Sequence, residues 1–122
     1  MPCRRVRGAT AVETDTAEEI LEATLGLLRR LTRANELRHE EIASAIFTVT
    51  SDTRAAFLAP TARQLGWQHV VLLDALEVPV PGAVQQCIGV LIHWNTTETQ
   101  QQVRHICLRG AAALRADLSE QL

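Results

Sequence analysis

Arginines near the start of the chain are the first residues whose chemistry suggests a functional site. Arg5 and Arg7 fall on one face of a predicted strand, Arg4 falls on the opposite face, and Gly8 follows directly. A guanidinium group beside a glycine can present two parallel N–H donors to a carboxylate. A solvated strand edge is the simpler interpretation of this pattern, and Arg63 is likewise explained by an ordinary surface charge.

A single carboxylate within an apolar stretch is the second candidate. Glu77 stands between Leu76 and Val78, where a buried carboxylate would need a polar partner. An acidic side chain is unusual at such a strand end. We therefore treat Glu77 as a candidate site residue, with an ordinary partnered carboxylate as the alternative.

Metal and nucleophile chemistry have weaker support. His105 and Cys107 are two residues apart and share a strand face, and Cys87 or His93 could complete a zinc site with them. No CxxC or HxxxH motif accompanies them, so buried thiols and a hydrogen-bonded histidine are the better interpretation. There is no nucleophile elbow or phosphate-binding glycine loop. All 12 basic side chains are Arg, which excludes a lysine Schiff base. The sequence predicts neither a metal nor a cofactor.

The composition predicts one globular domain over residues 1–122, because 47% of the residues are hydrophobic and 21% are charged. The net charge of −2 gives no cationic field for nucleic acid. No apolar run approaches the roughly 18 residues of a membrane span. The basic start lacks the apolar core of a secretory signal, and the 3 cysteines are an odd set. We therefore expect reduced thiols in a cytoplasmic protein.

The most secure predicted element is a helix that begins after Thr16 and ends at Asn35. The Thr16 hydroxyl can cap the helix while Glu19 reaches back, as in a capping box. One apolar stripe follows at helical spacing and consists of Ile20, Ala23, Leu27, Leu28 and Leu31. A helical turn is expected at 39–42, and a second helix at 60–65 begins with Pro60.

Five segments have the β-branched or continuously apolar composition of strands, namely residues 5–14, 45–50, 70–73, 87–94 and 103–108. The fourth is long enough to be central, and residues 95–102 form a polar loop. This order predicts an α+β fold with a mixed five-stranded sheet, one long helix and short helices. The helices are too few to cover both sheet faces, so the second face should meet another subunit.

Short motifs along nearly the whole chain resemble one family in their order and spacing. The run Val6-Arg7-Gly8-Ala9-Thr10 with Asp15-Thr16-Ala17-Glu18-Glu19-Ile20 resembles the start of the AroH-class chorismate mutases. The resemblance continues through these further runs: Phe47-Thr48-Val49-Thr50 with Asp52, Ala56-Phe57, Ala62-Arg63, Gly66-Trp67, Glu77-Val78, Val80-Pro81-Gly82, Cys87-Ile88, Asn95-Thr96-Thr97, Val103-Arg104-His105 and Leu114-Arg115 with Asp117-Leu118. Each run is weak alone, but together they are highly specific.

The resemblance implies a homotrimer in which three sheets pack as a pseudo-α/β barrel, with active sites in the clefts between subunits. It also implies the rearrangement of chorismate to prephenate, which is pericyclic and needs no covalent intermediate, metal or cofactor. Catalysis then consists of holding a dianion in its reactive conformer and stabilising charge on the breaking ether oxygen. Arginines suit both tasks, because they stay charged and bind carboxylates with two parallel donors.

The resemblance also assigns roles to individual residues. Arg7 resembles the arginine that binds a substrate carboxylate and the ether region. Glu77 resembles the carboxylate that accepts a hydrogen bond from the ring hydroxyl, and Arg63 resembles the mobile arginine at the mouth of the site. Phe57 and Leu73 resemble apolar walls of the cleft, and Arg115 resembles a residue of the C-terminal segment that folds over it.

Three expected site positions depart from the family pattern. Gly89 stands where the family has the arginine that faces the breaking ether oxygen. Cys107 replaces a tyrosine, and Asp74 adds an anion where a small neutral residue is expected. These departures predict weak or altered chorismate mutase activity unless another cation, Arg5 or Arg63, takes the place of the missing one.

Two other functions stay open on the sequence alone. Glycine in place of a long side chain at Gly89 enlarges the cleft, which Asp74, Cys107 and His93 would then line. The protein could therefore be a family member that acts on a different small molecule in a specialised pathway. It could also be a trimer that binds a ligand without catalysis.

Overall fold

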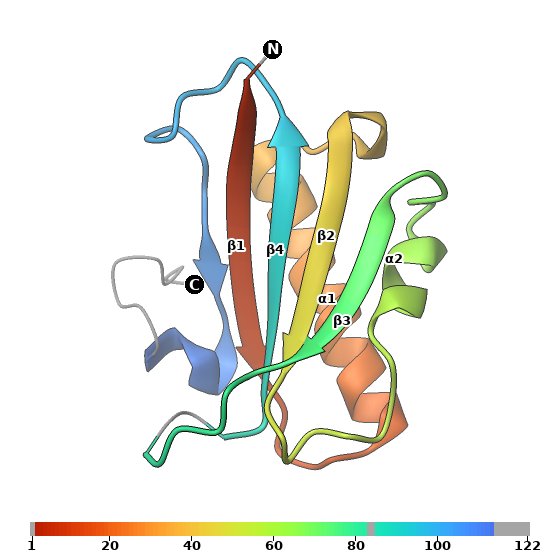
Figure 1. Ribbon diagram of the computed structural model, residues 1–122, viewed down its shortest axis with the longest axis vertical. Coiled ribbons are helices and arrows are strands. Elements are labelled where there is room, and N and C mark those ends of the chain that lie inside the picture. The colour runs from red at the N-terminus through yellow and green to blue at the C-terminus, as the bar shows by residue number, and fades with distance from the viewer. Residues whose placement is uncertain (1, 83–84, 114–122) are drawn as a thin grey trace.

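The computed structural model describes residues 2–82 and 85–113 (Figure 1). Its strands and helices follow the chain as β1 (Cys3–Ala11), α1 (Ala17–Asn35), β2 (Ile42–Val49), α2 (Ala59–Gln64), β3 (Val71–Leu76), β4 (Cys87–Asn95) and β5 (Ile106–Cys107). Short 3-10 helices precede β2 at His39–Glu41 and follow β5 at Arg109–Ala113. The order confirms the predicted α+β class.

The five strands form one mixed sheet in the order β3-β2-β4-β1-β5. β4 lies at the centre and runs antiparallel to both β1 and β2. The outer pairs, β2 with β3 and β1 with β5, are parallel. This arrangement confirms the mixed five-stranded sheet and the central position predicted for residues 87–94.

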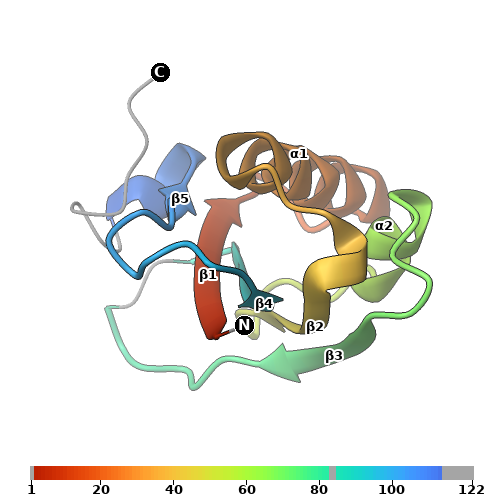
Figure 2. The ribbon, with the colours of Figure 1, turned by 90° about the horizontal axis from the view of Figure 1, so that it is seen from above.

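Both helices pack on the same face of the sheet (Figure 2). The buried side of α1 is the predicted stripe with Thr24 added, namely Ile20, Ala23, Thr24, Leu27, Leu28 and Leu31. These side chains meet the core face of the strands, where Val6, Phe47 and Ile92 have no exposed surface. None of the helices in residues 2–82 and 85–113 is long and apolar enough to cross a membrane.

The ends of α1 differ in detail from the prediction. Thr16 caps the helix by accepting the Glu19 N–H at 3.3 Å, but the Glu19 carboxylate reaches past Thr16 and accepts the Glu13 N–H at 2.7 Å. Asn35 is the last helical residue, and Glu36 adopts the left-handed conformation with φ 52°. The Asn35 side chain accepts the backbone N–H of Arg104 at 2.8 Å, which ties the helix end to the chain before β5.

Two strand predictions are wrong at their ends. β1 stops at Ala11 instead of residue 14, because the Glu13 N–H bonds to Glu19 and not to a neighbouring strand. β5 covers only Ile106–Cys107 of the predicted 103–108. Side chains take the place of strand pairing there, since Arg104 bonds to Asn35 and the Arg7 N–H donates to His105 Nδ1 at 3.0 Å.

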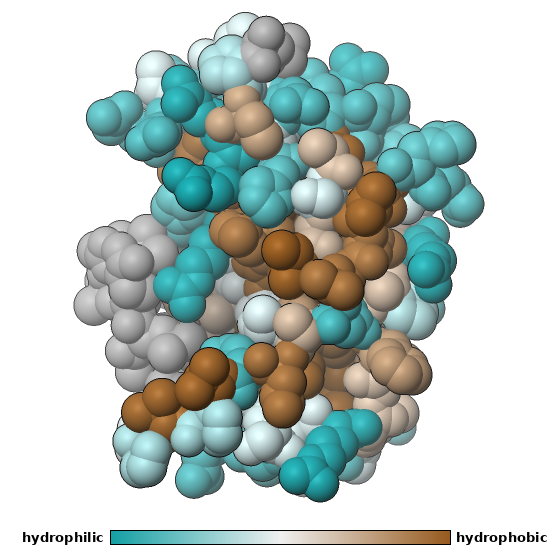
Figure 3. All heavy atoms as spheres, viewed as in Figure 1, coloured by the Kyte–Doolittle hydropathy of each residue, from teal (hydrophilic) through white to brown (hydrophobic). Residues whose placement is uncertain are grey.

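The face of the sheet opposite the helices is uncovered within the described chain. Hydrophobic side chains gather on this side of the molecule (Figure 3). Val71 and Leu73 of β3 lie on this face and are 69% and 57% exposed. Phe57, in the loop before α2, is 78% exposed. Contiguous apolar surface of this kind is typical of a protein–protein interface.

Gly8 of β1 lies close against α1. A Cβ atom at this position would lie 2.6 Å from Leu31 Cδ1 and 3.1 Å from Leu27 Cδ1. Both leucines are completely buried, so neither has free space into which to move. Glycine at this position therefore sets how closely the helix packs on the sheet.

We predict that Gly8→Ala destabilises the protein by about 1–3 kcal/mol, because an extra methyl group overpacks the core. Chemical denaturation at a fixed protein concentration measures this change. The control is Gly26→Ala in α1, where an added Cβ meets no atom within 4 Å. Gly26→Ala should stabilise by about 0.5–1 kcal/mol through helix propensity. Equal effects at the two glycines would contradict the packing argument.

Candidate active site

A cavity of about 270 Å³ opens on the uncovered face of the sheet. It brings together Arg7, Glu77 and Gly89, three residues that the sequence predicted for one site. Its lining residues come from β1, β2, the segment after β3, and β4: Arg7, Ala9, Thr48, Glu77, Cys87, Gly89, Val90 and Leu91. A cation, a carboxylate and apolar walls thus share one small cavity.

Strand register places these residues together. Gly89 of β4 pairs with Ala9 of β1 on one side and with Thr48 of β2 on the other. Arg7 pairs with Leu91, the next residue of β4 on the same face. Alternation along β1 turns Val6 and Gly8 toward the helix, and therefore turns Arg7 toward the cavity.

Glu77 is fixed by two hydrogen bonds to β2. Its backbone N–H donates to the carbonyl oxygen of Val49 at 2.8 Å, which continues the pairing of β3 with β2. Its carboxylate accepts the Thr48 hydroxyl at 3.0 Å through Oε2. The carboxylate therefore points into the cavity with one oxygen already bonded.

Thr48 also fills the space above Gly89. A Cβ atom on Gly89 would lie 2.5 Å from Thr48 Oγ1 and 3.8 Å from Glu77 Oε2. The sequence analysis did not single out Thr48 as a site residue. Its place in the site follows from the register between β2 and β4, which no local sequence motif reveals. Any side chain at position 89 therefore requires Thr48 to rotate and to release Glu77.

Cys87 and Cys107 lie beside the cavity in a small buried cluster with Ala9 and Ala111. Burial first, and the Glu77 carboxylate second, raise the pKa of the Cys87 thiol to about 12. The thiol is protonated at neutral pH and is not a nucleophile. Cys107, which the sequence analysis placed at the site, is 1% exposed and is not among the residues that line this cavity within one chain.

Asp52 holds the start of β4 against the end of β2. Its carboxylate accepts the Gln86 N–H at 3.0 Å and the Thr50 hydroxyl, and Thr50 Oγ1 accepts the Cys87 N–H at 2.9 Å. The hydrogen bond from Thr50 is the main cause that lowers the pKa of Asp52. The stabilisation is therefore present above the unfolded-state pKa of this carboxyl and is lost as pH falls through its depressed folded value.

Within one chain, Asp74 lies on the opposite side of the sheet from the cavity. It pairs with Phe47 of the core, so alternation turns both side chains toward the helices. Asp74 Oδ2 accepts the Leu58 N–H at 2.9 Å at the start of α2, and Oδ1 is buried without a hydrogen-bond partner in the described chain. Within one chain, Asp74 therefore adds no negative charge to this cavity.

The remaining predicted residues are outside the cavity. Phe57 and Leu73 are exposed, and Arg63 lies at the surface of α2. Arg115 falls outside the described residues. Within one chain, one cavity thus contains Arg7, Glu77 and Gly89 of the predicted site. Phe57, Arg63 and Leu73 lie instead in or next to α2 and β3.

Arg5, one of the two arginines expected to compensate for Gly89, lies opposite His93 in the sheet. They pair with each other four residues along the strands, about 13 Å from the Gly89 row. His93 Nδ1 is hydrogen-bonded to Ser44 Oγ at 3.0 Å. Within residues 2–82 and 85–113, no group of three His, Cys, Asp or Glu side chains is placed to hold a metal ion.

Comparisons with known proteins place this geometry in a family. The family model described as chorismate mutase type I matches residues 3–118. The chain is 51% identical to the chorismate mutase AroH of Thermus thermophilus, over 94% of this chain and 95% of that protein. It is 39% identical to chorismate mutase AroH of Bacillus subtilis, over 98% of this chain and 94% of that protein.

The fold agrees with these matches. A solved structure of a chorismate mutase from Clostridium thermocellum superposes with a TM-score of 0.87 and is 41% identical, covering 89% of this chain and 97% of that one. Sequence, fold and the arrangement of Arg7 and Glu77 in one cavity point the same way. The chain belongs to the chorismate mutase type I family, a family of isomerases.

Proposed function

We propose that the protein converts chorismate to prephenate in the cavity between Arg7 and Glu77, and that it does so slowly because position 89 carries no cation. The observation that supports this most directly is the placement of one guanidinium and one fixed carboxylate in a single apolar-walled cavity. An intramolecular rearrangement needs no nucleophile, and the protonated Cys87 thiol supplies none.

Each residue has a distinct task in this reaction. One C–O bond breaks and one C–C bond forms within the same molecule, so no proton is transferred. Arg7 binds a carboxylate of the dianion and stabilises negative charge that develops on the ether oxygen. Glu77 accepts the hydrogen bond of the ring hydroxyl, and the Thr48 hydroxyl keeps its carboxylate in place. These contacts select the compact reactive conformer.

We propose further that the active protein is a homotrimer in which a neighbouring subunit closes the cavity. The cavity is open on the face where Val71 and Leu73 of β3 expose apolar surface. Three residues expected as walls or at the mouth of the site do not line this cavity in the same chain, namely Phe57, Leu73 and Arg63. Packing of these residues from a second chain over the cavity would complete the site.

The test of assembly is Leu73→Glu, which places a charge on the exposed apolar face of β3. Light scattering should report three chains for the wild type and a smaller species for the variant, because a desolvated charge weakens the interface. Ala17→Glu adds the same charge at the exposed start of α1, on the covered side of the sheet, and should stay trimeric. A monomeric wild-type protein would contradict this part of the proposal.

The test of function is the loss of chorismate and the appearance of prephenate with purified protein. We predict that Arg7→Gln lowers kcat/KM by about 10²–10³-fold, the usual effect of losing one preorganised donor. Arg54→Gln at an exposed loop should leave the rate unchanged. If the wild type leaves chorismate unchanged, a different carboxylate substrate or binding without catalysis replaces this proposal.

The missing cation gives a gain-of-function prediction. Relative to Thr48→Ala alone, which releases Glu77, Gly89→Arg combined with Thr48→Ala should raise kcat by about 10²–10³-fold, because the arginine places a positive charge at the ether oxygen and the alanine makes room for it. Gly89→Gln with Thr48→Ala has similar bulk without the charge and should show no gain. If the two double variants have the same rate, the absence of a cation at position 89 does not limit catalysis.

A further inference from the structure

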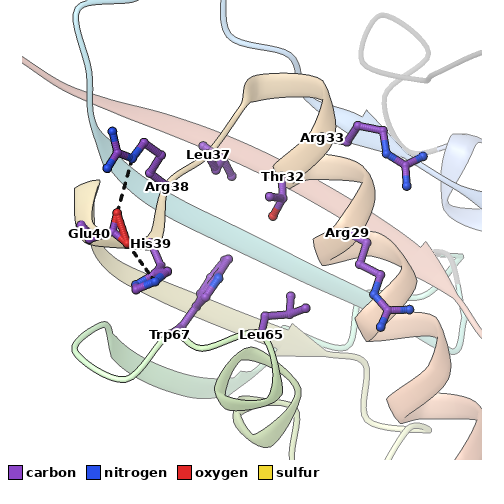
Figure 4. A pocket seen from close by; sticks show the side chains of 9 residues that line it. All are labelled: Arg29, Thr32, Arg33, Leu37, Arg38, His39, Glu40, Leu65 and Trp67. Atoms are coloured by element: carbon purple, nitrogen blue, oxygen red, sulfur yellow. Dashed lines mark ion pairs between the residues drawn. The ribbon is translucent and has the colours of Figure 1, made fainter.

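A second pocket lies on the helix side of the sheet, away from the Arg7 cavity. It has a volume of about 580 Å³, within the roughly 300–1,000 Å³ of small-molecule sites. Its walls come from the last turns of α1, the connection to β2, and the turn after α2. Its lining residues are Arg29, Thr32, Arg33, Leu37, Arg38, His39, Glu40, Leu65 and Trp67 (Figure 4).

The floor of the pocket is apolar and aromatic. Trp67 and Leu37 are 3% and 8% exposed and belong to the hydrophobic core, and Leu65 packs against that core. They are therefore held rigidly by the fold. Trp67 presents little surface, so an apolar ring seated in the pocket would rest on Leu65 and on the small exposed part of the Trp67 indole.

The rim of the pocket is cationic. Arg29 and Arg33 are exposed and lie one turn apart on the same side of α1, at one edge of the pocket (Figure 4). Glu40 is the one acidic side chain among the lining residues that the structure describes. It is already bound to Arg38 at 3.4 Å and to His39 at 2.8 Å. Three arginines against one glutamate give a local positive charge on a chain of net charge −2.

Helix stability explains only part of this arrangement. A cation in the last turn, such as Arg33, complements the helix dipole. That effect requires neither an aromatic floor nor a second arginine at Arg29. In the same wall, the Thr32 hydroxyl is buried and has no hydrogen-bond partner within the described chain. Its rotation toward the pocket would offer a donor to an acceptor seated there.

We propose that this pocket binds a small carboxylate that carries an aromatic ring. The ring would pack on Leu65 and touch the exposed part of the Trp67 indole. The Arg29 and Arg33 side chains extend away from Trp67 (Figure 4), and they would turn toward the pocket to donate hydrogen bonds to the carboxylate. The site is separate from the Arg7 cavity, because the sheet lies between them. It also faces away from the uncovered sheet surface, so the proposed trimer leaves it accessible.

The test uses 2-naphthoate and its neutral isostere 2-naphthamide with the full chain. Titration is followed by NMR on the two indole N–H signals, which Trp67→Phe assigns. Naphthoate should shift the Trp67 signal more than that of Trp94, and naphthamide should bind more weakly. Arg29→Gln and Arg33→Gln should each weaken naphthoate binding about fivefold, as expected for a partly exposed charge contact.

The controls separate this site from the rest of the molecule. Arg54→Gln removes a positive charge at the opposite end of α1, near Asp15, and should leave the affinity for naphthoate unchanged. Arg7→Gln should also leave it unchanged, so this result does not depend on activity toward chorismate. The proposal is overturned if naphthoate at millimolar concentration leaves the Trp67 signal in place. It is also overturned if Arg29→Gln and Arg33→Gln have no effect, or if Arg7→Gln abolishes binding.

Discussion

The pairing of β4 with β1 and β2 is the constraint on which the site depends. Nine consecutive pairs join β4 to β1, from Cys3↔Asn95 to Ala11↔Cys87. A shift of one residue along this ladder would turn every side chain of β4 to the other face. Burial of Ile88, Val90 and Ile92 beneath α1 prevents such a shift. The same register brings Arg7 close to Gly89 and sets Thr48 directly opposite it, so core packing also fixes the geometry of the cavity.

The cavity combines few groups, and each is restrained in a different way. Arg7 is placed by β1, and its backbone N–H is bonded to His105 Nδ1. Glu77 is placed by β2 through both its backbone and its carboxylate. A reaction that needs positioned charges rather than bond-forming side chains suits this arrangement. The exposed apolar residues of β3 lie on the same face of the sheet as the cavity. A subunit that packs on this face in the proposed trimer would therefore also close the cavity.

Local signals predicted much of the fold. The Thr16 cap and the apolar stripe of α1 act within a few residues of each other, so the sequence locates the helix well. The resemblance to a family supplied Arg7 and Glu77, which the structure places in one cavity. Cross-strand relations were harder to predict. The role of Thr48 depends on its pairing with Gly89, and the side on which Asp74 lies depends on its pairing with Phe47. His105 and Asn35 bond to backbone across the fold and shorten β5, which strand propensity does not reveal.

The hydroxyl of Thr48 has a consequence for how this protein can evolve. A long side chain at position 89 can enter only if Thr48 gives up the hydrogen bond that steadies Glu77, because both need the same space. A change at position 89 alone crowds Thr48, and a change at Thr48 alone releases Glu77. The effects of substitutions at the two positions are therefore coupled and not additive.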